Sequence, residues 1–196
     1  IYNSYFAEFV ETFSKTAIPD YLPHAFFIDG GSLAVENALK VAFDWKIRKN
    51  IQAGRGELGT KIIHFNQAFH GRSGYTLSLT NTSDPRKTMY FPMFDWPRVD
   101  NPKISFPITD AVLEKVQEKE KHAMEQIKSA IKNHPNDIAA IIIEPIQGEG
   151  GDNHFRDEFI TSLRQICDEN NLMFIMDEVQ TGIGITGKWW AHEHFT

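Results

Sequence analysis

The feature that most constrains this sequence is an uninterrupted apolar run, Ile138–Ile143, which ends at an acidic residue, Glu144. A second apolar run, residues 172–176, ends in the same way at Asp177. Strands with apolar residues on both faces are typical of parallel sheets that helices cover on both sides. Such open sheets place their ligand-binding groups at the carboxyl ends of the strands. The sequence therefore predicts a buried parallel sheet with two carboxylates at its ligand-binding edge.

Helical patterns alternate with the predicted strands. Apolar residues recur at helical spacing over residues 33–50 and 155–171, whereas residues 111–133 predict a charged, mostly exposed helix. Lys61–Phe65 predicts one more strand. Strands that alternate with helices are joined by right-handed crossovers. The predicted fold class is therefore α/β, with a mostly parallel sheet and helices on both faces in a three-layer α/β/α arrangement.

Three further segments carry weaker patterns. Residues 4–17 predict a helix with its apolar residues on one side, and Pro19 ends it. Residues 25–28 predict a short strand. Residues 80–106 contain four prolines and little periodicity, which predicts an excursion over the surface.

Composition limits the class of protein. The 196 residues suit one ordinary domain, and 41% hydrophobic with 23% charged residues excludes a disordered or fibrous chain. The net charge of -6 argues against a nucleic-acid binder, and no apolar run approaches the roughly 20 residues that span a bilayer. The single cysteine, Cys167, lies on the apolar face of a predicted helix and excludes an intramolecular disulfide. We therefore expect a cytoplasmic protein with no membrane or nucleic-acid partner.

Gly31 and Ser32 stand at the start of the helix predicted over residues 33–50. Free backbone N–H groups and the positive end of the helix dipole can bind a phosphate there, and a serine hydroxyl adds one more hydrogen bond. The alternative is that Ser32 is an ordinary N-cap.

The tetrapeptide Phe69-His70-Gly71-Arg72 follows the strand Lys61–Phe65. An aromatic ring at a strand end can stack on a planar heterocycle, and a guanidinium can bind a carboxylate through two parallel hydrogen bonds. The alternatives are that Phe69 belongs to the core, that His70 is a hydrogen-bonded polar residue and that Arg72 is a surface arginine.

Acidic groups follow the two buried strands. Three glycines after Glu144 allow its loop to approach a ligand closely, and Glu149 lies within this loop. Asp177 can hold a proton on a buried aromatic nitrogen; the alternatives are that Asp177 caps the next segment and that Glu149 is a solvated side chain. His192 and His194 predict no metal site, because zinc usually needs three or four converging ligands.

Together these motifs resemble the class III (ω-)aminotransferases of the fold-type I pyridoxal-phosphate group. The matching stretches, in family order, are residues 29–42, 66–72, 143–151 and 176–184. Within the family, residues 69–80 and 188–191 are most similar to the lysine 6-transaminases. The resemblance implies the large domain of a PLP-dependent transferase-like fold.

The resemblance also implies pyridoxal 5'-phosphate as the cofactor. Gly31 and Ser32 would bind its phosphate. Phe69 and Val179 would press on opposite faces of its pyridine ring, and Gln180 would hydrogen-bond its phenolic oxygen.

The resemblance gives catalytic roles to Asp177 and Glu144. Asp177 would keep the ring nitrogen protonated, so that the ring draws electrons from the reacting carbon. A charge pair at 4 Å and an effective dielectric of 20 gains about 4 kcal/mol before desolvation, which is enough to decide a protonation state. Glu144 would support the cofactor region and the neighbourhood of Asp177, and His70 would support the site nearby.

Arg72 and Glu149 are the implied substrate-binding residues. The matching arginine of lysine 6-transaminases anchors the far carboxylate of the substrate, which leaves the terminal amine at the cofactor. Glu149 resembles an acidic gate that pairs with a later arginine for one substrate and swings away for the other. We therefore expect transfer of the terminal amino group of L-lysine to 2-oxoglutarate. The alternative donors are ornithine, 4-aminobutyrate or another ω-amine.

The chain begins with Ile1, and in this family the lysine that bonds to the cofactor follows the matching aspartate by a few dozen residues. We therefore expect a piece of a longer polypeptide. It would comprise an N-terminal helical segment, residues 1–24, and a truncated cofactor domain, residues 25–196, without the catalytic lysine and the C-terminal small domain. Such a piece would be inactive alone, and at best a cofactor-binding or interaction module. The parent is expected to be a homodimer, because the family builds its site between two subunits.

Overall fold

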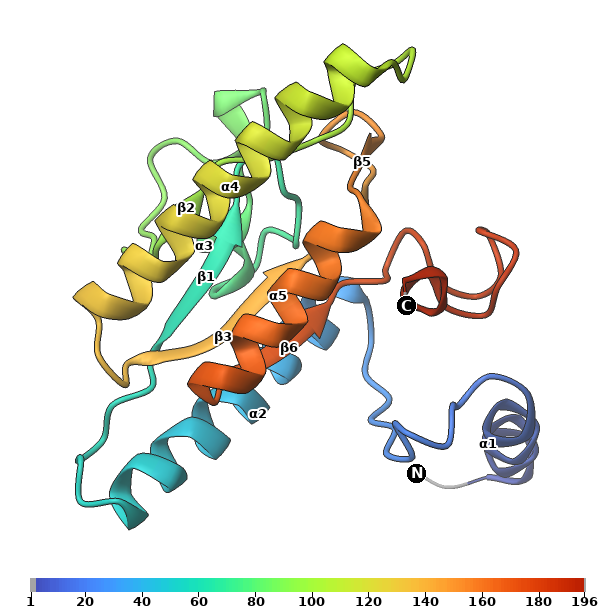
Figure 1. Ribbon diagram of the computed structural model, residues 1–196. Helices are drawn as coiled ribbons and strands as arrows, with labels where there is room; N and C mark the ends of the chain where they lie inside the picture. The colour runs from blue at the N-terminus through green and yellow to red at the C-terminus, as the bar shows by residue number, and fades with distance from the viewer. Residues whose placement is uncertain (1–2, 196) are drawn as a thin grey trace.

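The computed structural model describes residues 3–195, and its core is a 4-stranded parallel sheet in the order β2-β1-β3-β6 (Figure 1). The strands are β1 (Lys61–Phe65), β2 (Arg98–Val99), β3 (Ile138–Ile143) and β6 (Met173–Met176). β3 pairs with β1 on one side and with β6 on the other. Because the strands are parallel, the loops that follow β1, β3 and β6 meet at one edge of the sheet.

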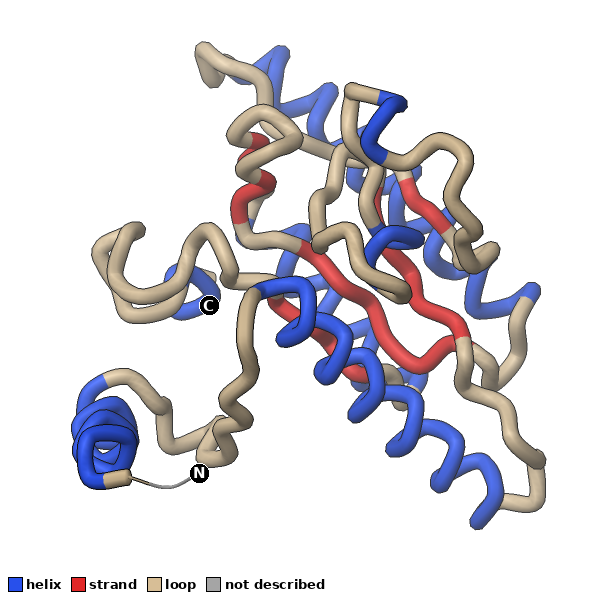
Figure 2. Tube along the Cα trace, turned by 180° about the vertical axis from the view of Figure 1, so that it is seen from behind, coloured by secondary structure: helices blue, strands red, loops and turns tan. Residues whose placement is uncertain are grey.

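Helices cover both faces of this sheet. Helix α2 (Gly31–Gln52) lies against one face, and α4 (Asp110–Asn133) and α5 (Asp157–Asn170) lie against the other, as Figures 1 and 2 show from opposite sides. A short helix, α3 (Thr76–Leu79), packs on the same face as α2. The three-layer α/β/α prediction is confirmed.

Side chains that alternate along β3 fill two separate cores. Ile141 and Ile143 pack with the apolar sides of α4 and α5, whereas Ala140 and Ile142 pack with α2. All residues of β3 are buried, as a strand in the middle of a covered sheet requires. Cys167 is buried in the first core, as its place on an apolar helix face predicts.

The predicted bounds of β1 and β3 are confirmed, and the three predicted main helices are present with shifted ends. The burial predicted for the strand at residues 172–176 is wrong. β6 begins at Met173, and its residues are only partly buried because β6 is the edge strand in the described part of the chain. Between β3 and α5, the strands β4 (Ile146–Gln147) and β5 (Asn153–His154) form a short antiparallel hairpin.

Two predictions for the weaker segments are wrong. Residues 25–28 form no strand, because they pair with no strand in residues 3–195, and Phe26 among them is exposed. Residues 80–106 are not only a surface excursion. They contain β2, and they bury the side chains of Trp96 and Val99 in the two cores.

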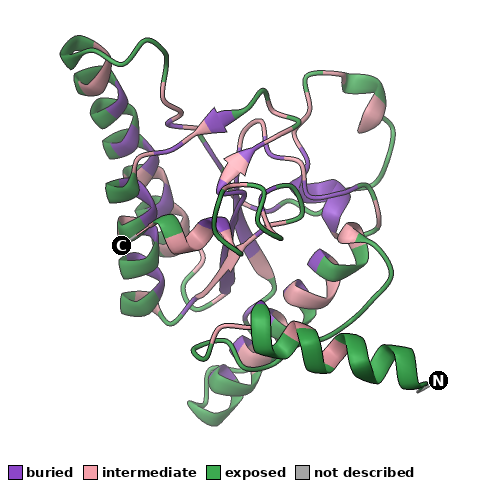
Figure 3. Cartoon of the chain, turned by 90° about the vertical axis from the view of Figure 1, so that its right-hand side faces the viewer, coloured by how far each residue is buried: buried purple, intermediate pink, exposed green. Residues whose placement is uncertain are grey.

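The N-terminal helix α1 (Ser4–Thr16) lies apart from the sheet (Figure 1), and none of its residues is buried (Figure 3). Its end contacts the C-terminal segment. The indole N–H of Trp190 donates to the carbonyl of Ala17 at 2.6 Å, and Phe13 packs edge-on against the Trp190 ring. The last element is the 3-10 helix η2 (Ala191–His194).

The predicted ranges 1–24 and 25–196 include Ile1, Tyr2 and Thr196, which lie outside the described residues. The boundary between the two ranges stays a prediction. Of the helices in residues 3–195, none combines the length and the apolar character needed to cross a bilayer.

Candidate active site

One cavity of about 230 Å³ lies where the loops after β1, β3 and β6 meet the first turn of α2. All the predicted cofactor-binding residues line it: Gly31, Ser32, Phe69, His70, Glu144, Asp177, Val179 and Gln180. Gly71 and Glu149 complete the lining. The fold thus gathers residues that are far apart in the sequence at the edge where open α/β sheets bind ligands.

A larger hollow of about 760 Å³ lies between the N-terminal segment and α5. Its lining is mainly apolar, whereas the smaller cavity brings buried titratable side chains together. Clustered polar groups in a concave site are the better sign of chemistry. We therefore place the candidate active site in the smaller cavity.

The start of α2 forms one wall of the cavity. The helix begins at Gly31 rather than at the predicted Leu33, and Gly30 before it has a φ of 87° and no side-chain cap. Ser32 therefore lies inside the first turn, so the alternative that Ser32 is the N-cap is wrong. The N–H groups of a first helical turn have no partner within the helix, and together with the helix dipole they favour an anion.

Gly71 brings the loop after β1 against this helix start. Its φ is +116°, and a Cβ on it would lie 2.2 Å from Oγ of Ser32 and 2.8 Å from Oγ1 of Thr76. Only glycine fits there without displacing Ser32. In the same way, a Cβ on Gly31 would lie 3.0 Å from the methyl groups of Val179. The two glycines therefore allow the loop after β1 and the loop after β6 to lie close to the start of α2.

His70 and Asp177 form a buried pair in the wall of the cavity. Nδ1 of His70 lies 2.7 Å from Oδ2 of Asp177, and the two side chains are 0% and 3% exposed. Nδ1 donates this hydrogen bond, because an ionised carboxylate only accepts. The backbone N–H of Val179 donates to Oδ1 of Asp177 at 3.1 Å. Asp177 thus caps the next turn, as the simpler alternative predicts, and it also belongs to the cavity.

The other ring nitrogen of His70, Nε2, is buried and has no hydrogen-bond partner within residues 3–195. A buried polar atom that lacks a partner costs about 1–3 kcal/mol. A ligand with a polar group near His70 would relieve this cost.

Glu144 lies next to this pair, at the end of β3. Its Oε1 accepts from the N–H of Phe69 at 2.7 Å, and its Oε2 accepts from the N–H of Gly148 at 3.3 Å. Burial raises the pKa of Glu144 to about 7, and the charge of Asp177 adds to this rise. The charge of His70 and the two N–H donors oppose it. Glu144 therefore anchors the loop after β1 and can exchange a proton near neutral pH.

Phe69, Val179 and Gln180 occupy the more open side of the cavity. Phe69 is half-buried, and Val179 and Gln180 are exposed. An aromatic ring and a branched side chain in one cavity can hold a planar ring between them. The contacts of these three side chains with a cofactor stay predictions.

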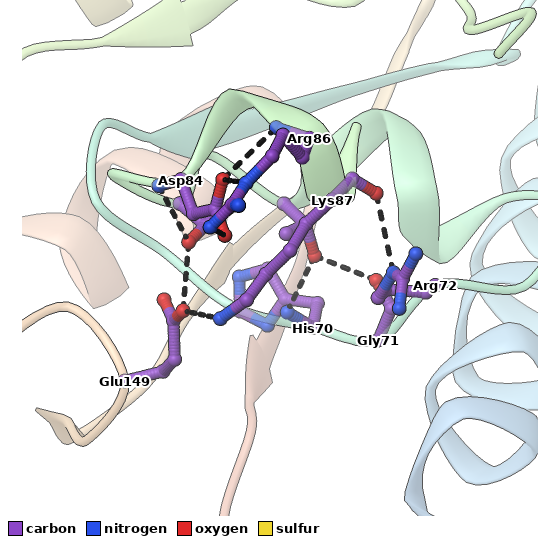
Figure 4. Close-up of polar contacts among 9 residues, drawn as sticks. His70, Gly71, Arg72, Asp84, Arg86, Lys87 and Glu149 are labelled. Atoms are coloured by element: carbon purple, nitrogen blue, oxygen red, sulfur yellow. Dashed lines mark hydrogen bonds and ion pairs between the residues drawn. The ribbon is translucent and has the colours of Figure 1, made fainter. Parts of the chain in front are cut away.

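The two predicted substrate-binding residues are placed differently. Arg72 is exposed and does not line the cavity, and its Nε donates to the carbonyl of Lys87 at 3.2 Å. Glu149 lines the cavity and is not simply solvated: its Oε1 accepts from Oγ1 of Thr82 at 2.7 Å and from Nζ of Lys87 at 2.6 Å (Figure 4). Lys87 therefore contacts both residues. Their roles toward a substrate stay predictions.

Two further residues hold the site in place, and sequence patterns did not single them out. The buried hydroxyl of Thr80 accepts from the N–H of His70 at 3.1 Å and donates to the carbonyl of Gly71 at 2.7 Å. The carboxylate of Glu178 accepts from the N–H groups of Ala191 at 2.6 Å and of His192 at 2.9 Å. Both residues lie within stretches that resemble the family, residues 69–80 and 176–184, but their residue types alone do not predict these contacts.

The C-terminal histidines have other partners. Nδ1 of His192 lies 2.8 Å from Oε1 of Glu178, and Nε2 of His194 lies 3.1 Å from the carbonyl of Thr186. Within residues 3–195, no group of three or more His, Cys, Asp and Glu side chains is placed to hold a metal ion.

Comparison with known proteins gives concordant matches. The family model described as "Aminotransferase class-III" matches residues 2–196. The L-lysine-epsilon aminotransferase of Mycobacterium tuberculosis is 50% identical over 194 residues, which cover 98% of this chain and 42% of that protein. The mitochondrial 4-aminobutyrate aminotransferase of Homo sapiens is 40% identical over 184 residues, which cover 84% of this chain and 36% of that protein.

Solved structures agree with these matches. Lysine aminotransferase from M. tuberculosis superimposes with a TM-score of 0.94 at 50% identity, covering 100% of this chain and 44% of that one. A transaminase from the marine bacterium Virgibacillus has a TM-score of 0.79 at 26% identity, covering 100% of this chain and 40% of that one. The chain therefore spans less than half the length of the relatives that it matches.

Gly71→Ala should destabilise the folded chain. The added Cβ would meet Oγ of Ser32 while the backbone stays at a φ of +116°, so we expect a loss of about 1–3 kcal/mol in the free energy of unfolding. Urea denaturation measures the loss. Gly74→Ala is the matched control, because its Cβ would make only an ordinary contact, 3.6 Å from Glu36. Equal losses at both positions would contradict the close contact between Gly71 and Ser32.

Glu144 should make the folded chain less stable as the pH rises. The pKa of this carboxyl is about 7 in the folded chain and 4.5 ordinarily, so the folded chain keeps a proton that the unfolded chain releases between these values. The stability from this proton is fully present below pH 4.5 and is lost as the pH rises through about 7. The total change is on the order of 3 kcal/mol.

Glu144→Gln removes this titration and keeps an acceptor for the N–H of Phe69. Between pH about 5 and about 8, the free energy of unfolding of the wild type should therefore fall relative to that of the variant. Denaturation of both proteins across this range measures the difference. Glu57→Gln, at an exposed carboxylate outside the cavity, is the matched control. A difference at position 144 that does not change with pH would contradict the raised pKa.

Proposed function

The chain belongs to the class III aminotransferases, and from this membership we propose that the whole protein transfers the terminal amino group of L-lysine to 2-oxoglutarate with pyridoxal 5'-phosphate. One observation carries the proposal. The buried His70–Asp177 pair and the start of α2 line the same cavity. A carboxylate suited to a protonated ring nitrogen therefore lies in the same cavity as a helix start suited to a phosphate. The relatives named as lysine aminotransferases support lysine as the donor.

The first turn of α2 fits the phosphate group of this cofactor. Its N–H groups, the hydroxyl of Ser32 and the positive end of the helix dipole are all suited to an anion. The bare Cα of Gly71 allows the loop after β1 to close over Ser32. A side chain at position 71 would collide with the hydroxyl of Ser32.

His70 and Asp177 fit the nitrogen end of a pyridine ring. Asp177 would hold a proton on that nitrogen, and His70 keeps the carboxylate oriented through Nδ1. The unpartnered Nε2 of His70 provides one more polar contact in the same wall. When bound, pyridoxal phosphate supplies a ring that withdraws electrons from the substrate carbon. Phe69 and Val179 would hold that ring from its two faces and exclude water from it.

Arg72 and Glu149 would orient the substrate. Arg72 would bind the carboxylate of the donor far from its reacting amine, and Glu149 would distinguish the ends of donor and acceptor by charge. 4-Aminobutyrate is the second candidate donor, because relatives with that name also match this chain.

We place residues 25–196 in the cofactor domain of a homodimer. Large apolar side chains such as Tyr21, Leu22 and Phe26 are exposed in the segment between α1 and α2, and such a surface suits contact with a further part of the protein or a second subunit. A cytoplasmic location is supported by Cys167, which is buried and unpaired, as a reducing compartment favours.

Full-length protein loaded with pyridoxal phosphate should react with L-lysine in the absence of an acceptor. The visible absorption of the bound cofactor should change on addition of lysine, and more slowly on addition of ornithine or 4-aminobutyrate, because the distance from the carboxylate to the amine differs. A response to 4-aminobutyrate alone would replace lysine by the second candidate. No response to any of the three amines would overturn the proposal.

Asp177→Asn should slow this half-reaction about 100- to 1000-fold, because an amide does not hold a positive charge on the ring nitrogen. Stopped-flow absorbance with lysine measures the rate. Asp20→Asn, at an exposed aspartate of the N-terminal segment, is the control and should leave the rate unchanged. An unchanged rate in Asp177→Asn would remove this residue from the site.

A further inference from the structure

Lys87 joins the two residues that the proposed function assigns to the substrate. Its Nζ donates to Oε1 of Glu149 at 2.6 Å, and its backbone carbonyl accepts from Nε of Arg72 at 3.2 Å (Figure 4). Lys87 is the last residue of a 3-10 helix, η1 (Pro85–Lys87), so both contacts come from one short turn. Along the chain, Glu149 is 62 residues from Lys87, and the fold alone brings them together.

Glu149 is an anion at the cavity. Its side chain is 28% exposed, and its Oε1 also accepts from the hydroxyl of Thr82. Partial burial raises the pKa of Glu149, but the hydrogen bonds from Lys87 and Thr82 and the charge of Lys87 outweigh burial, and the pKa lies below its ordinary value. Lys87 is therefore the cation that offsets this negative charge.

We propose that Lys87 is a positioning residue, which holds Glu149 and Arg72 in one arrangement and makes the mouth of the cavity accept the carboxylate of a dicarboxylic ligand. The inference rests on the proposed function, in which a dicarboxylic 2-oxo acid and an amino donor use the same cavity. A carboxylate that enters beside Glu149 meets a neutralised ion pair. Without the ammonium of Lys87 it would meet an unpaired like charge, which repels it.

Removal of the Lys87 ammonium should weaken the binding of a carboxylate but not the binding of an amine. An unpaired Glu149 attracts an ammonium group, so a cationic ligand end loses nothing when the charge of Lys87 is removed. If Lys87 only supported the local structure, its removal would weaken the binding of both kinds of ligand. The two signs therefore separate a charge effect from general damage.

Arg86 provides a matched control on the same turn. It precedes Lys87 in η1, but its guanidinium binds Asp84 through hydrogen bonds of 2.9 and 3.0 Å, and its side chain is 84% exposed. Arg86→Met thus removes one positive charge from η1 without removing a contact to Glu149.

The test uses full-length protein loaded with pyridoxal phosphate, together with glutarate, a dicarboxylate that has neither an amine nor an oxo group. Lys87→Met should raise the Kd of glutarate, measured by calorimetry, about three- to fivefold, as the loss of one partly exposed ion pair implies. The Michaelis constant for the oxo-acid acceptor should rise by a similar factor. The Michaelis constant for L-lysine should fall or stay unchanged.

Three variants show through which group Lys87 acts. Lys87→Arg keeps the cation and should restore the Kd of glutarate. In a Glu149→Gln background, Lys87→Met should change this Kd by less than about 1.5-fold, because the charge through which Lys87 acts is absent. Arg86→Met should leave the Kd unchanged.

Several results would overturn the role of Lys87. They are an unchanged glutarate Kd in Lys87→Met, an equal weakening of glutarate and lysine, an undiminished effect in the Glu149→Gln background, and a wild type that does not bind glutarate. A wild type that binds glutarate but transfers no amino group would instead contradict the proposed function. Calorimetry would then still decide the role of Lys87.

Discussion

The hydrogen bond between His70 and Asp177 is the contact on which the site depends. It joins the loop after β1 to the end of β6, two strands that β3 separates in the sheet. Both side chains are buried, so the removal of one partner would leave the other without its hydrogen bond, at a cost of about 1–3 kcal/mol. Glu144, at the end of β3, hydrogen-bonds the backbone of the same loop. The ends of three neighbouring strands are therefore held together by side-chain hydrogen bonds.

The middle of the fold could be predicted because its sequence pattern and its tertiary environment agree. Ile138–Ile143 is apolar throughout, and so short an apolar run is typical of a strand with both faces covered. Residues 25–28 are also apolar, but a strand needs a neighbour to pair with, and a local pattern does not contain that neighbour. The sequence pattern does not predict the strand Arg98–Val99, because a segment of two residues is too short to show the alternation of apolar and polar residues that marks a strand. The partial burial of β6 follows from its place in the sheet, which its own residues do not encode.

The walls of the cavity could be predicted because they follow strand ends and a helix start, which motifs mark. The contacts that hold those walls could not. Thr80 and Lys87 belong to a proline-rich segment without periodicity, and the path of that segment brings them to His70 and Glu149. The residue type of Ser32 suits an N-cap, but the helix begins at Gly31, so Ser32 lies in the first turn and lines the cavity. The residue types therefore indicate which side chains can line the cavity, but not the exact place of each one in its helix or loop.

Trp190 and Ala17, which join the end of α1 to the C-terminal segment, are 173 residues apart in the chain. Closing so long a loop costs conformational entropy, and the sheet must form before these two residues can meet. No residue of α1 is buried, whereas every residue of β3 is, so α1 gains less from burial than the middle of the sheet does. We infer that α1 joins the folded chain last and leaves it first. Its amide hydrogens would then exchange with solvent by local opening, while those of β3 would wait for global unfolding.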